Sequence, residues 1–157
     1  MAVATRGHEF ADGRRGFDAL ARPRAGIVIH GIGIDVLRRS RVEKVWNRFG
    51  SRFPRRVLLD EERDFMAKTA NPVRFLAMRF AAKEAIVKAM GTGFAHGMWV
   101  RDVGSVPNDW GQPQIIYSPR GEAMREKLGI GDGHLTLTDE AGLVVAVAVL
   151  MKSEPVS

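Results

Sequence analysis

Two carboxylates and one lysine have types and spacing that suit phosphate chemistry. Glu84 and Lys88 stand four residues apart in a helical pattern, so they share one helix face, a turn apart. Asp35 closes the run Gly31-Ile32-Gly33-Ile34. Mg²⁺ commonly takes one or two protein carboxylates and completes its octahedral shell with water and substrate phosphates. Asp35 and Glu84 are therefore candidate Mg²⁺ ligands, and Lys88 a candidate for neutralising phosphate charge.

The same residues also have ordinary structural explanations. A Glu–Lys pair at this spacing is commonly a solvated surface pair worth roughly 0.3–0.5 kcal/mol. A lone aspartate at the end of a strand is commonly a turn or cap residue. Gly91-Thr92-Gly93 follows a helix instead of joining a strand to one, which is typical of a helix C-cap and not of a phosphate-binding loop. Spacing alone leaves both explanations open.

The elements that must position these residues are a strand and a long helix. Residues 27–36 are apolar and β-branched with interleaved glycines, which predicts a strand. On a period of two, Asp35 shares a face with Gly31 and Gly33, and this face is open to close approach by another backbone. Residues 71–90 predict a long helix that Asn71-Pro72 begins and Gly91-Thr92-Gly93 ends. Its best core candidates are Leu76, Ile86, Val87 and Met90.

The rest of the chain predicts shorter elements. Ser40-Arg41-Val42-Glu43 has the form of a capping box and predicts a helix that ends near Gly50. Ser118-Pro119 predicts a second capped helix, to about Leu128. The pattern also predicts a short helix from about residue 60, strands at 99–106 and 114–117, and a hairpin of strands 134–138 and 143–151 with its turn at 139–142. This order predicts an α+β fold with a mostly antiparallel sheet packed on the long helix.

Positive charge is concentrated in one segment. The 157 residues carry a net charge of +6, yet residues 37–56 hold eight basic residues against Glu43 alone, a local net charge of +7. Such asymmetry indicates that an anionic partner docks there. A basic stripe of Arg41, Lys44, Arg48 and Arg52 lies beside the apolar stripe of Val42, Val45, Trp46 and Phe49. No motif for reading nucleic acid accompanies the charge, so an acidic protein helix fits better.

Composition limits the class of protein. The length fits one domain, and no apolar run is long enough to cross a bilayer, so we expect no membrane span. The chain has no cysteine, which excludes disulfide scaffolds and thiolate metal sites and suits a cytoplasmic location. We expect a loosely ordered N-terminal extension at residues 1–26, one domain at 27–152 and a tail at 153–157.

Several motifs, in order along the chain, resemble those of the holo-[acyl-carrier-protein] synthases, the small bacterial-type 4′-phosphopantetheinyl transferases. They are Gly31-Ile32-Gly33-Ile34-Asp35, the segment 79–85 (Arg-Phe-Ala-Ala-Lys-Glu-Ala), the segment 88–93 (Lys-Ala-Met-Gly-Thr-Gly), Gly111-Gln112-Pro113 and the segment 134–139 (His-Leu-Thr-Leu-Thr-Asp). The resemblance spans roughly residues 27–152. Met90 departs from the pattern, which has an aromatic residue before Gly-Thr-Gly; this is a packing change that leaves the chemistry intact.

The resemblance implies a reaction and a set of roles. Phosphopantetheine would pass from coenzyme A to a serine of apo-acyl carrier protein, and adenosine 3′,5′-bisphosphate would leave. Asp35 and Glu84 would bind Mg²⁺, or Mn²⁺ in its place; Glu84 would act as base, directly or through water; and Lys88 would stabilise the diphosphate. The nucleotide would be bound by Arg79, Lys88, Gly91 and His134, and the acidic carrier protein by Arg41, Arg48 and Arg52. The family fold assembles as a homotrimer with active sites between subunits.

Two other functions are weighed against this one. The basic segment 40–52 could serve a non-enzymatic module that binds nucleic acid or protein, an alternative supported by the charge alone. The chain could also be an assembly subunit with an enzyme-like scaffold and no turnover. The ordered motifs favour the transferase, with no nucleic-acid or membrane partner.

Overall fold

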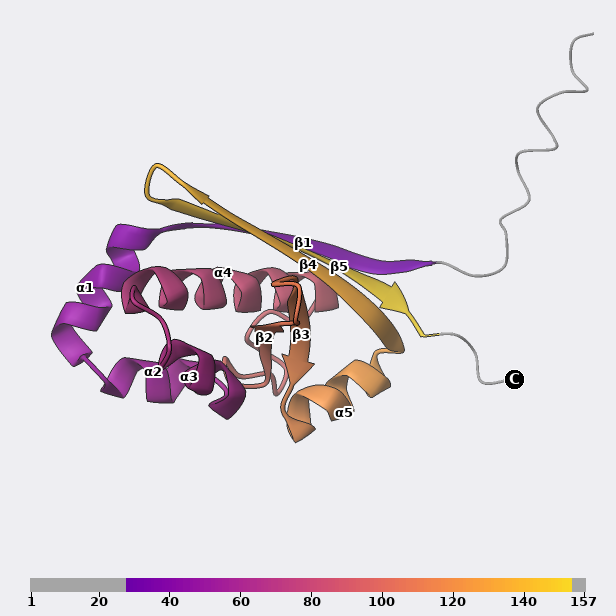
Figure 1. Ribbon diagram of the computed structural model, residues 1–157. Helices are drawn as coiled ribbons and strands as arrows, with labels where there is room; N and C mark the ends of the chain where they lie inside the picture. The colour runs from indigo at the N-terminus through magenta and orange to yellow at the C-terminus, as the bar shows by residue number, and fades with distance from the viewer. Residues whose placement is uncertain (1–27, 154–157) are drawn as a thin grey trace, which may run out of the picture.

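The computed structural model describes residues 28–153 and contains five helices and five strands in that range (Figure 1). In chain order they are β1 (Ile29–Arg38), α1 (Arg39–Phe49), α2 (Arg52–Val57), α3 (Asp60–Met66), α4 (Pro72–Met90), β2 (Val103–Pro107), β3 (Pro113–Tyr117), α5 (Pro119–Lys127), β4 (Ile130–Glu140) and β5 (Leu143–Lys152). The expected N-terminal extension 1–26 and residues 154–157 of the expected tail lie outside the described residues. No helix in the described range is long and apolar enough to cross a membrane.

The fold is α+β with antiparallel pairing, as predicted. One sheet has three strands in the order β1-β5-β4, and β2 pairs with β3 in a separate two-stranded sheet. Helix α4 lies between the larger sheet and a layer that holds α2, α3 and the β2–β3 pair (Figure 1). The active-site candidates are therefore carried by this central helix and by β1, an edge strand of the larger sheet.

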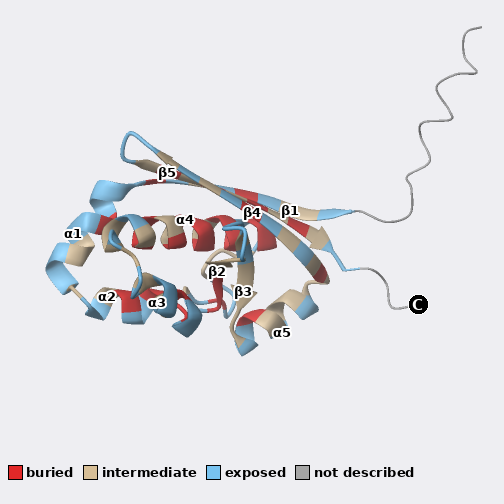
Figure 2. Cartoon of the chain, viewed as in Figure 1, coloured by how far each residue is buried: buried red, intermediate tan, exposed pale blue. Residues whose placement is uncertain are grey.

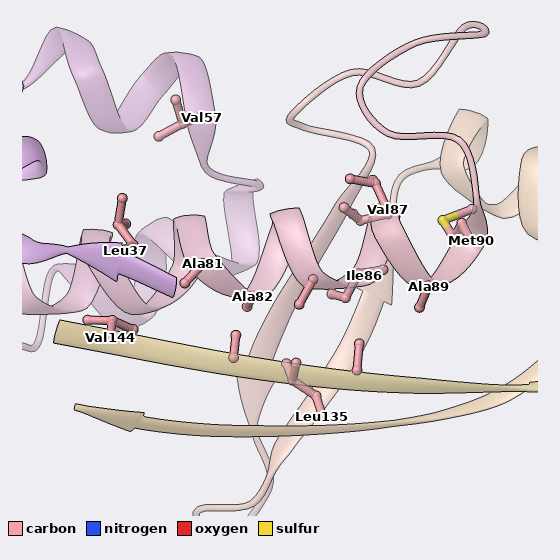
Figure 3. Close-up of a cluster of buried hydrophobic side chains, with 14 of the residues drawn as sticks. Leu37, Val57, Ala81, Ala82, Ile86, Val87, Ala89, Met90, Leu135 and Val144 are labelled. Atoms are coloured by element: carbon pink, nitrogen blue, oxygen red, sulfur yellow. The ribbon is translucent and has the colours of Figure 1, made fainter. Parts of the chain in front are cut away.

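Helix α4 supplies most of the core. Eleven of its residues are buried, and it carries a large share of the buried surface in Figure 2. Figure 3 shows its side chains facing Leu135 and Val144 of the sheet, with Val57 of α2 on another side. The predicted core residues Leu76, Ile86, Val87 and Met90 are each at most 2% exposed. Burial of this kind contributes roughly 25 cal/mol per Å² of apolar surface, so the position of α4 is strongly fixed.

The glycines of β1 allow α4 to lie directly on the strand. A Cβ atom added to Gly31 would sit 2.1 Å from the Ala89 carbonyl oxygen, and one added to Gly33 would sit 1.9 Å from that of Ala85. Real side-chain atoms do not approach backbone oxygen so closely. The close approach expected on this face is confirmed, and the approaching backbone is that of α4.

We expect Gly33→Ala to lower the free energy of unfolding by about 3 kcal/mol, since an overpacked methyl group must push α4 away from β1. Urea unfolding followed by circular dichroism measures this loss. Gly111→Ala is the matched control: its Cβ meets open space, and only its φ of 80° opposes the substitution, which costs about 1 kcal/mol. Equal losses in the two variants would contradict the steric explanation.

Two of the three predicted N-caps are confirmed. The Asn71 side chain accepts a hydrogen bond from the Arg74 N–H at 3.0 Å, and Ser118 accepts one from the Gly121 N–H at 3.1 Å. The capping box at Ser40 is wrong, because α1 already begins at Arg39 and has no side-chain cap. The cause is the sheet: β1 continues to Arg38, and the Arg39 N–H donates to the Gly142 carbonyl of the β4–β5 turn. The chain therefore enters α1 directly from a paired strand.

Other boundaries also differ from the prediction. Arg52 belongs to α2, a short helix that was not expected, and Phe49 at the end of the apolar stripe is 47% exposed. The strand predicted from residue 99 begins at Val103, because Asp102 accepts hydrogen bonds from the Trp99 N–H and the Ser118 hydroxyl and holds 99–102 as a turn. In the closing hairpin, β4 ends at Glu140 and β5 begins at Leu143, so the turn has two residues, Ala141 and Gly142, both with positive φ.

Candidate active site

Asp35 and Lys88 form the centre of the site. The Lys88 ammonium donates to Asp35 Oδ1 at 2.8 Å and to the Ile34 carbonyl at 3.0 Å. The Asp35 side chain is 15% exposed and that of Lys88 is 47% exposed, so the pair lies at the surface with the lysine accessible. Strand β1 and the last turn of α4 are thereby joined at a charged contact beside the glycine-cleared face.

Glu84 lies one turn before Lys88 on the same face of α4. Burial raises the pKa of its carboxyl group, and the charge of Asp35 raises it further, while the charge of Lys88 lowers it. A carboxylate whose charge is disfavoured by burial and by a neighbouring carboxylate is stabilised in its charged form by a cation placed beside both. The structure thus places Asp35, Glu84 and Lys88 in one cluster, which their spacing in the sequence alone could not establish.

The donor set of this cluster fits a hard cation. No group of three or more metal-ligating side chains occurs among the residues that the structure describes. Mg²⁺ needs only one or two carboxylates when water and phosphate oxygens complete its shell. Asp35 and Glu84 supply that number, and a divalent ion beside them would offset the effect of the Asp35 charge on Glu84.

Arg79 lies apart from this cluster, on α4 five residues before Glu84 and so about 140° around the helix. It is 8% exposed, its guanidinium stacks on the Phe75 ring at 4.5 Å, and its Nε has no hydrogen-bond partner among the described residues. Burial lowers its pKa. It lines a cavity of about 280 Å³ whose other walls include Arg74, Pro107, Gly111 and Thr136. A buried cation with an unused donor beside a cavity is equipped to hold an anion.

His134 and Gly91 also stand outside the cluster. His134 pairs with Val149, and Leu135, its neighbour, is buried against α4. Because side chains alternate along a strand, His134 is on the outer face of the sheet, whereas Asp35 shares the α4 face. Gly91 caps α4 with a φ of 79° and donates to the Val87 and Lys88 carbonyls. Within one chain the structure therefore separates Arg79 and His134 from the Asp35–Glu84–Lys88 cluster.

Arg41, Arg48 and Arg52 are exposed side chains of α1 and α2. The Arg48 guanidinium lies over the Phe49 ring at 5.1 Å. Arg41 also borders an apolar cavity of about 180 Å³ with Leu37, Val42, Val45, Phe53 and Phe80. Phe80, which also lines this cavity, lies one turn before Glu84 on α4, and Arg41, Arg48 and Arg52 together form the basic surface of α1 and α2.

Sequence reasoning missed a buried ion pair beneath the site. Glu62 and Lys83 are both fully buried, with Lys83 Nζ 2.7 Å from Glu62 Oε2. Glu62 is one of three acids in the first turn of α3, a position that the helix dipole alone would explain. The available signal is weak: a lysine within an otherwise apolar and alanine-rich stretch of α4, next to the candidate catalytic residue.

Comparison with known proteins identifies the family. Residues 31–148 match the family model described as the 4′-phosphopantetheinyl transferase superfamily. The chain belongs to this superfamily. The match begins at Gly31 and includes the whole of α4, so the Asp35–Glu84–Lys88 cluster lies inside the transferase domain.

Relatives of this transferase are similar over most of their length. The holo-[acyl-carrier-protein] synthase of Nitrosospira multiformis is 39% identical over 125 residues, which cover 80% of this chain and 100% of the relative. That of Nitratidesulfovibrio vulgaris is 45% identical over 123 residues, which cover 78% and 98%. The crystal structure of the Neisseria meningitidis synthase has a TM-score of 0.76 at 36% identity and covers 80% of this chain and 100% of its own. The structure from Bacillus anthracis, in complex with CoA (3′,5′-ADP), has a TM-score of 0.66 at 32% identity over 82% and 100%.

Proposed function

We propose that residues 27–152 transfer the 4′-phosphopantetheine group of coenzyme A to a serine of apo-acyl carrier protein, with Mg²⁺, and release adenosine 3′,5′-bisphosphate. The observation that carries the proposal is the contact of Lys88 with Asp35 beside Glu84. It is supported by the names of the relatives and by the coenzyme A in the Bacillus anthracis complex.

The reaction is a displacement at phosphorus. The serine oxygen bonds to the phosphorus that bears pantetheine, and the bond from that phosphorus to the bridging oxygen breaks, so the adenosine bisphosphate leaves with both electrons. Glu84 accepts the serine proton, a task suited by its raised pKa. Lys88 is exposed enough to leave Asp35, stabilise the charge of the diphosphate and protonate the leaving oxygen. Asp35 and Glu84 would hold Mg²⁺, or Mn²⁺ in its place, and the bound ion would supply polarisation of the attacked phosphate and an offset for charge on the leaving group.

Arg79, Gly91 and His134 are the proposed contacts of the nucleotide. Arg79 lies about 140° around α4 from Glu84. His134 lies on the outer face of the larger sheet, whereas Glu84 is on the helix that covers the inner face. Neither residue therefore joins Glu84 within one chain. We assign them to sites shared between copies, in which one subunit supplies the carboxylate cluster and another the nucleotide contacts.

Association into a homotrimer would cover the apolar outer face of the three-stranded sheet. Ile32, Ile34 and Val36 of β1 are 55–57% exposed, although all three are large and apolar. The register places them beside the valines of β5 that face the same way, Val145, Val147 and Val149. A contiguous apolar face of this kind marks a protein interface, and Figure 2 shows how much of β1 is not buried.

We expect Ile32→Glu to convert the assembly to monomers, since charged side chains would have to be desolvated where copies meet. Sedimentation velocity measures the change in mass. Phe65→Glu on α3 is the matched control, because Phe65 is also an exposed apolar residue, 37% exposed, but off the sheet. A monomeric wild-type chain would contradict the proposed assembly.

The first test of the reaction is intact-mass spectrometry of apo-acyl carrier protein incubated with this chain, coenzyme A and MgCl₂. We expect the carrier to gain one phosphopantetheine and to gain none when EDTA is added. A carrier of unchanged mass, with a folded enzyme and a competent carrier, would overturn the proposed function. A gain that persists in EDTA would overturn its metal dependence alone.

A further inference from the structure

A fully buried ion pair joins α4 to its neighbours directly behind the candidate site. The Lys83 ammonium lies 2.7 Å from Glu62 Oε2 and donates to the Val103 carbonyl at 2.5 Å. Glu62 also accepts hydrogen bonds from the Leu59 N–H at 2.9 Å and the Ser105 N–H at 3.0 Å. The pair therefore ties α4 to the start of α3 and to β2 through four polar contacts.

The neighbourhood is shaped around the Glu62 carboxylate. A Cβ atom at Gly104 would lie 2.8 Å from the carboxyl carbon and Oε1 of Glu62 and from Cδ1 of Leu59, so a side chain at residue 104 would force these side chains to move. The Glu62 charge also acts on Arg79, one turn before Lys83 on the same side of α4. One buried anion thus attracts two cations of α4, which lie about 100° and 140° around the helix from Glu84.

Stability alone does not account for charges at this place. Desolvating two ions is costly, and well-packed apolar residues in their place are often equally or more stabilising. An ion pair with fixed hydrogen bonds instead restricts geometry. Its partners can meet only when the helix has one rotation about its axis and one position along it. Lys83 and Glu84 are adjacent, so fixing Lys83 in the interior fixes the direction of Glu84 about 100° away.

We propose that the Glu62–Lys83 ion pair is a positioning device that sets the rotation of α4 and thereby holds Glu84 and Lys88 against Asp35. The inference rests on the proposed function where it predicts a change in kcat. The placement of Asp35 and Glu84, which would bind the metal, can be tested by metal binding without any turnover.

The test replaces both charges with apolar side chains of similar size, in the double variant Glu62→Leu/Lys83→Met. We expect a thermal midpoint equal to or above that of the wild type. We expect kcat to fall roughly 10- to 100-fold, as misplacement of catalytic groups causes, with the KM for carrier unchanged. Mn²⁺ binding, followed by electron paramagnetic resonance without substrates, should weaken in parallel. Wild-type kcat and Mn²⁺ affinity in this folded variant would overturn the proposal.

The matched control is Arg63→Met, which breaks another ion pair of α3, the helix that carries Glu62. The Arg63 guanidinium lies 2.6 Å from Asp60 Oδ1, but this pair is at the exposed surface of the helix. We expect wild-type kcat and Mn²⁺ affinity in this control. Equal losses in control and double variant would also overturn the proposal, because any α3 ion pair would then have the same effect.

A second variant keeps the test decisive if the apolar pair does not fold. Glu62→Gln/Lys83→Gln retains an acceptor for the Ser105 N–H and a donor toward the Val103 carbonyl, without charge and with a shorter reach than lysine. We expect it to fold with lower kcat and weaker Mn²⁺ binding, and unchanged values would overturn the proposal. A wild-type chain that binds Mn²⁺ but transfers nothing would remove the proposed function, while the Mn²⁺ comparison would still decide the positioning role.

Discussion

Glu84→Gln is expected to lower kcat by roughly 10²- to 10⁴-fold, the range that a positioned general base contributes. The amide keeps the size of the side chain but cannot accept the serine proton, and it is a weaker ligand for a divalent cation. Single-turnover transfer of phosphopantetheine, monitored by the mass of the carrier, measures the loss. The fold should survive, because the raised pKa of Glu84 indicates that its charge is not favoured where it lies.

Asp35→Asn should show a comparable loss of roughly 10²-fold or more, since it removes the other carboxylate and the partner of Lys88. Asp64→Asn provides the matched control. Asp64 is an exposed acid on α3, and its substitution removes the same charge without touching the cluster. Near-normal turnover of both site variants would refute the assignment of the cluster as the active centre. A loss in the Asp64 variant would show that net charge is responsible instead.

The strand and helix that build the cluster were predictable because several local signals agree. In α4 the periodicity, the Asn71-Pro72 start and the Gly91 end all indicate one helix, and the structure confirms its bounds at Pro72–Met90. In β1 the alternation of glycine with isoleucine indicated both a strand and a face open to close approach. These local signals do not show how β1 is positioned along α4, and this position brings Asp35 into contact with Lys88.

The errors occur where tertiary contacts override local sequence. Ser40 has the right neighbours for a capping box, but the β4–β5 turn already provides a partner for the Arg39 N–H. Trp99 and Val100 resemble a strand, but Asp102 folds them into a turn by bonding to residues 16 and 18 positions away, Ser118 and Arg120. Glu62 and Lys83 are separated by more than twenty residues, so no local pattern reveals that two charges meet in the core.

The roles of Arg79 and His134 illustrate a further limit of reasoning from one chain. Motif order along the sequence suggests that they belong to one site with Glu84, and the fold places them on other surfaces. The exposed apolar face of the larger sheet connects these facts, because association through that face would bring residues of one copy toward another. The site as a whole would then be a property of the assembly.

The basic surface of α1 and α2 leads to the second large expected effect. We expect the double variant Arg41→Glu/Arg48→Glu to raise the KM for acyl carrier protein about tenfold, since two attractions become two repulsions against an acidic helix. The KM for coenzyme A should remain as in the wild type, because both side chains point to solvent and neither belongs to the Asp35–Glu84–Lys88 cluster. Initial rates with each substrate varied in turn separate the two constants.

Salt and a distant charge reversal complete this test. Added salt should raise the wild-type KM for carrier, and it should change that of the variant less or in the opposite direction, because exposed charges are screened over about 10 Å at 0.1 M. Lys127→Glu at the exposed end of α5 alters net charge away from the basic surface and should leave the carrier KM unchanged. An unchanged carrier KM in the Arg41/Arg48 variant would refute docking at α1. An increase in the Lys127 variant of the same size would indicate a long-range effect of net charge instead of docking of the carrier helix at α1.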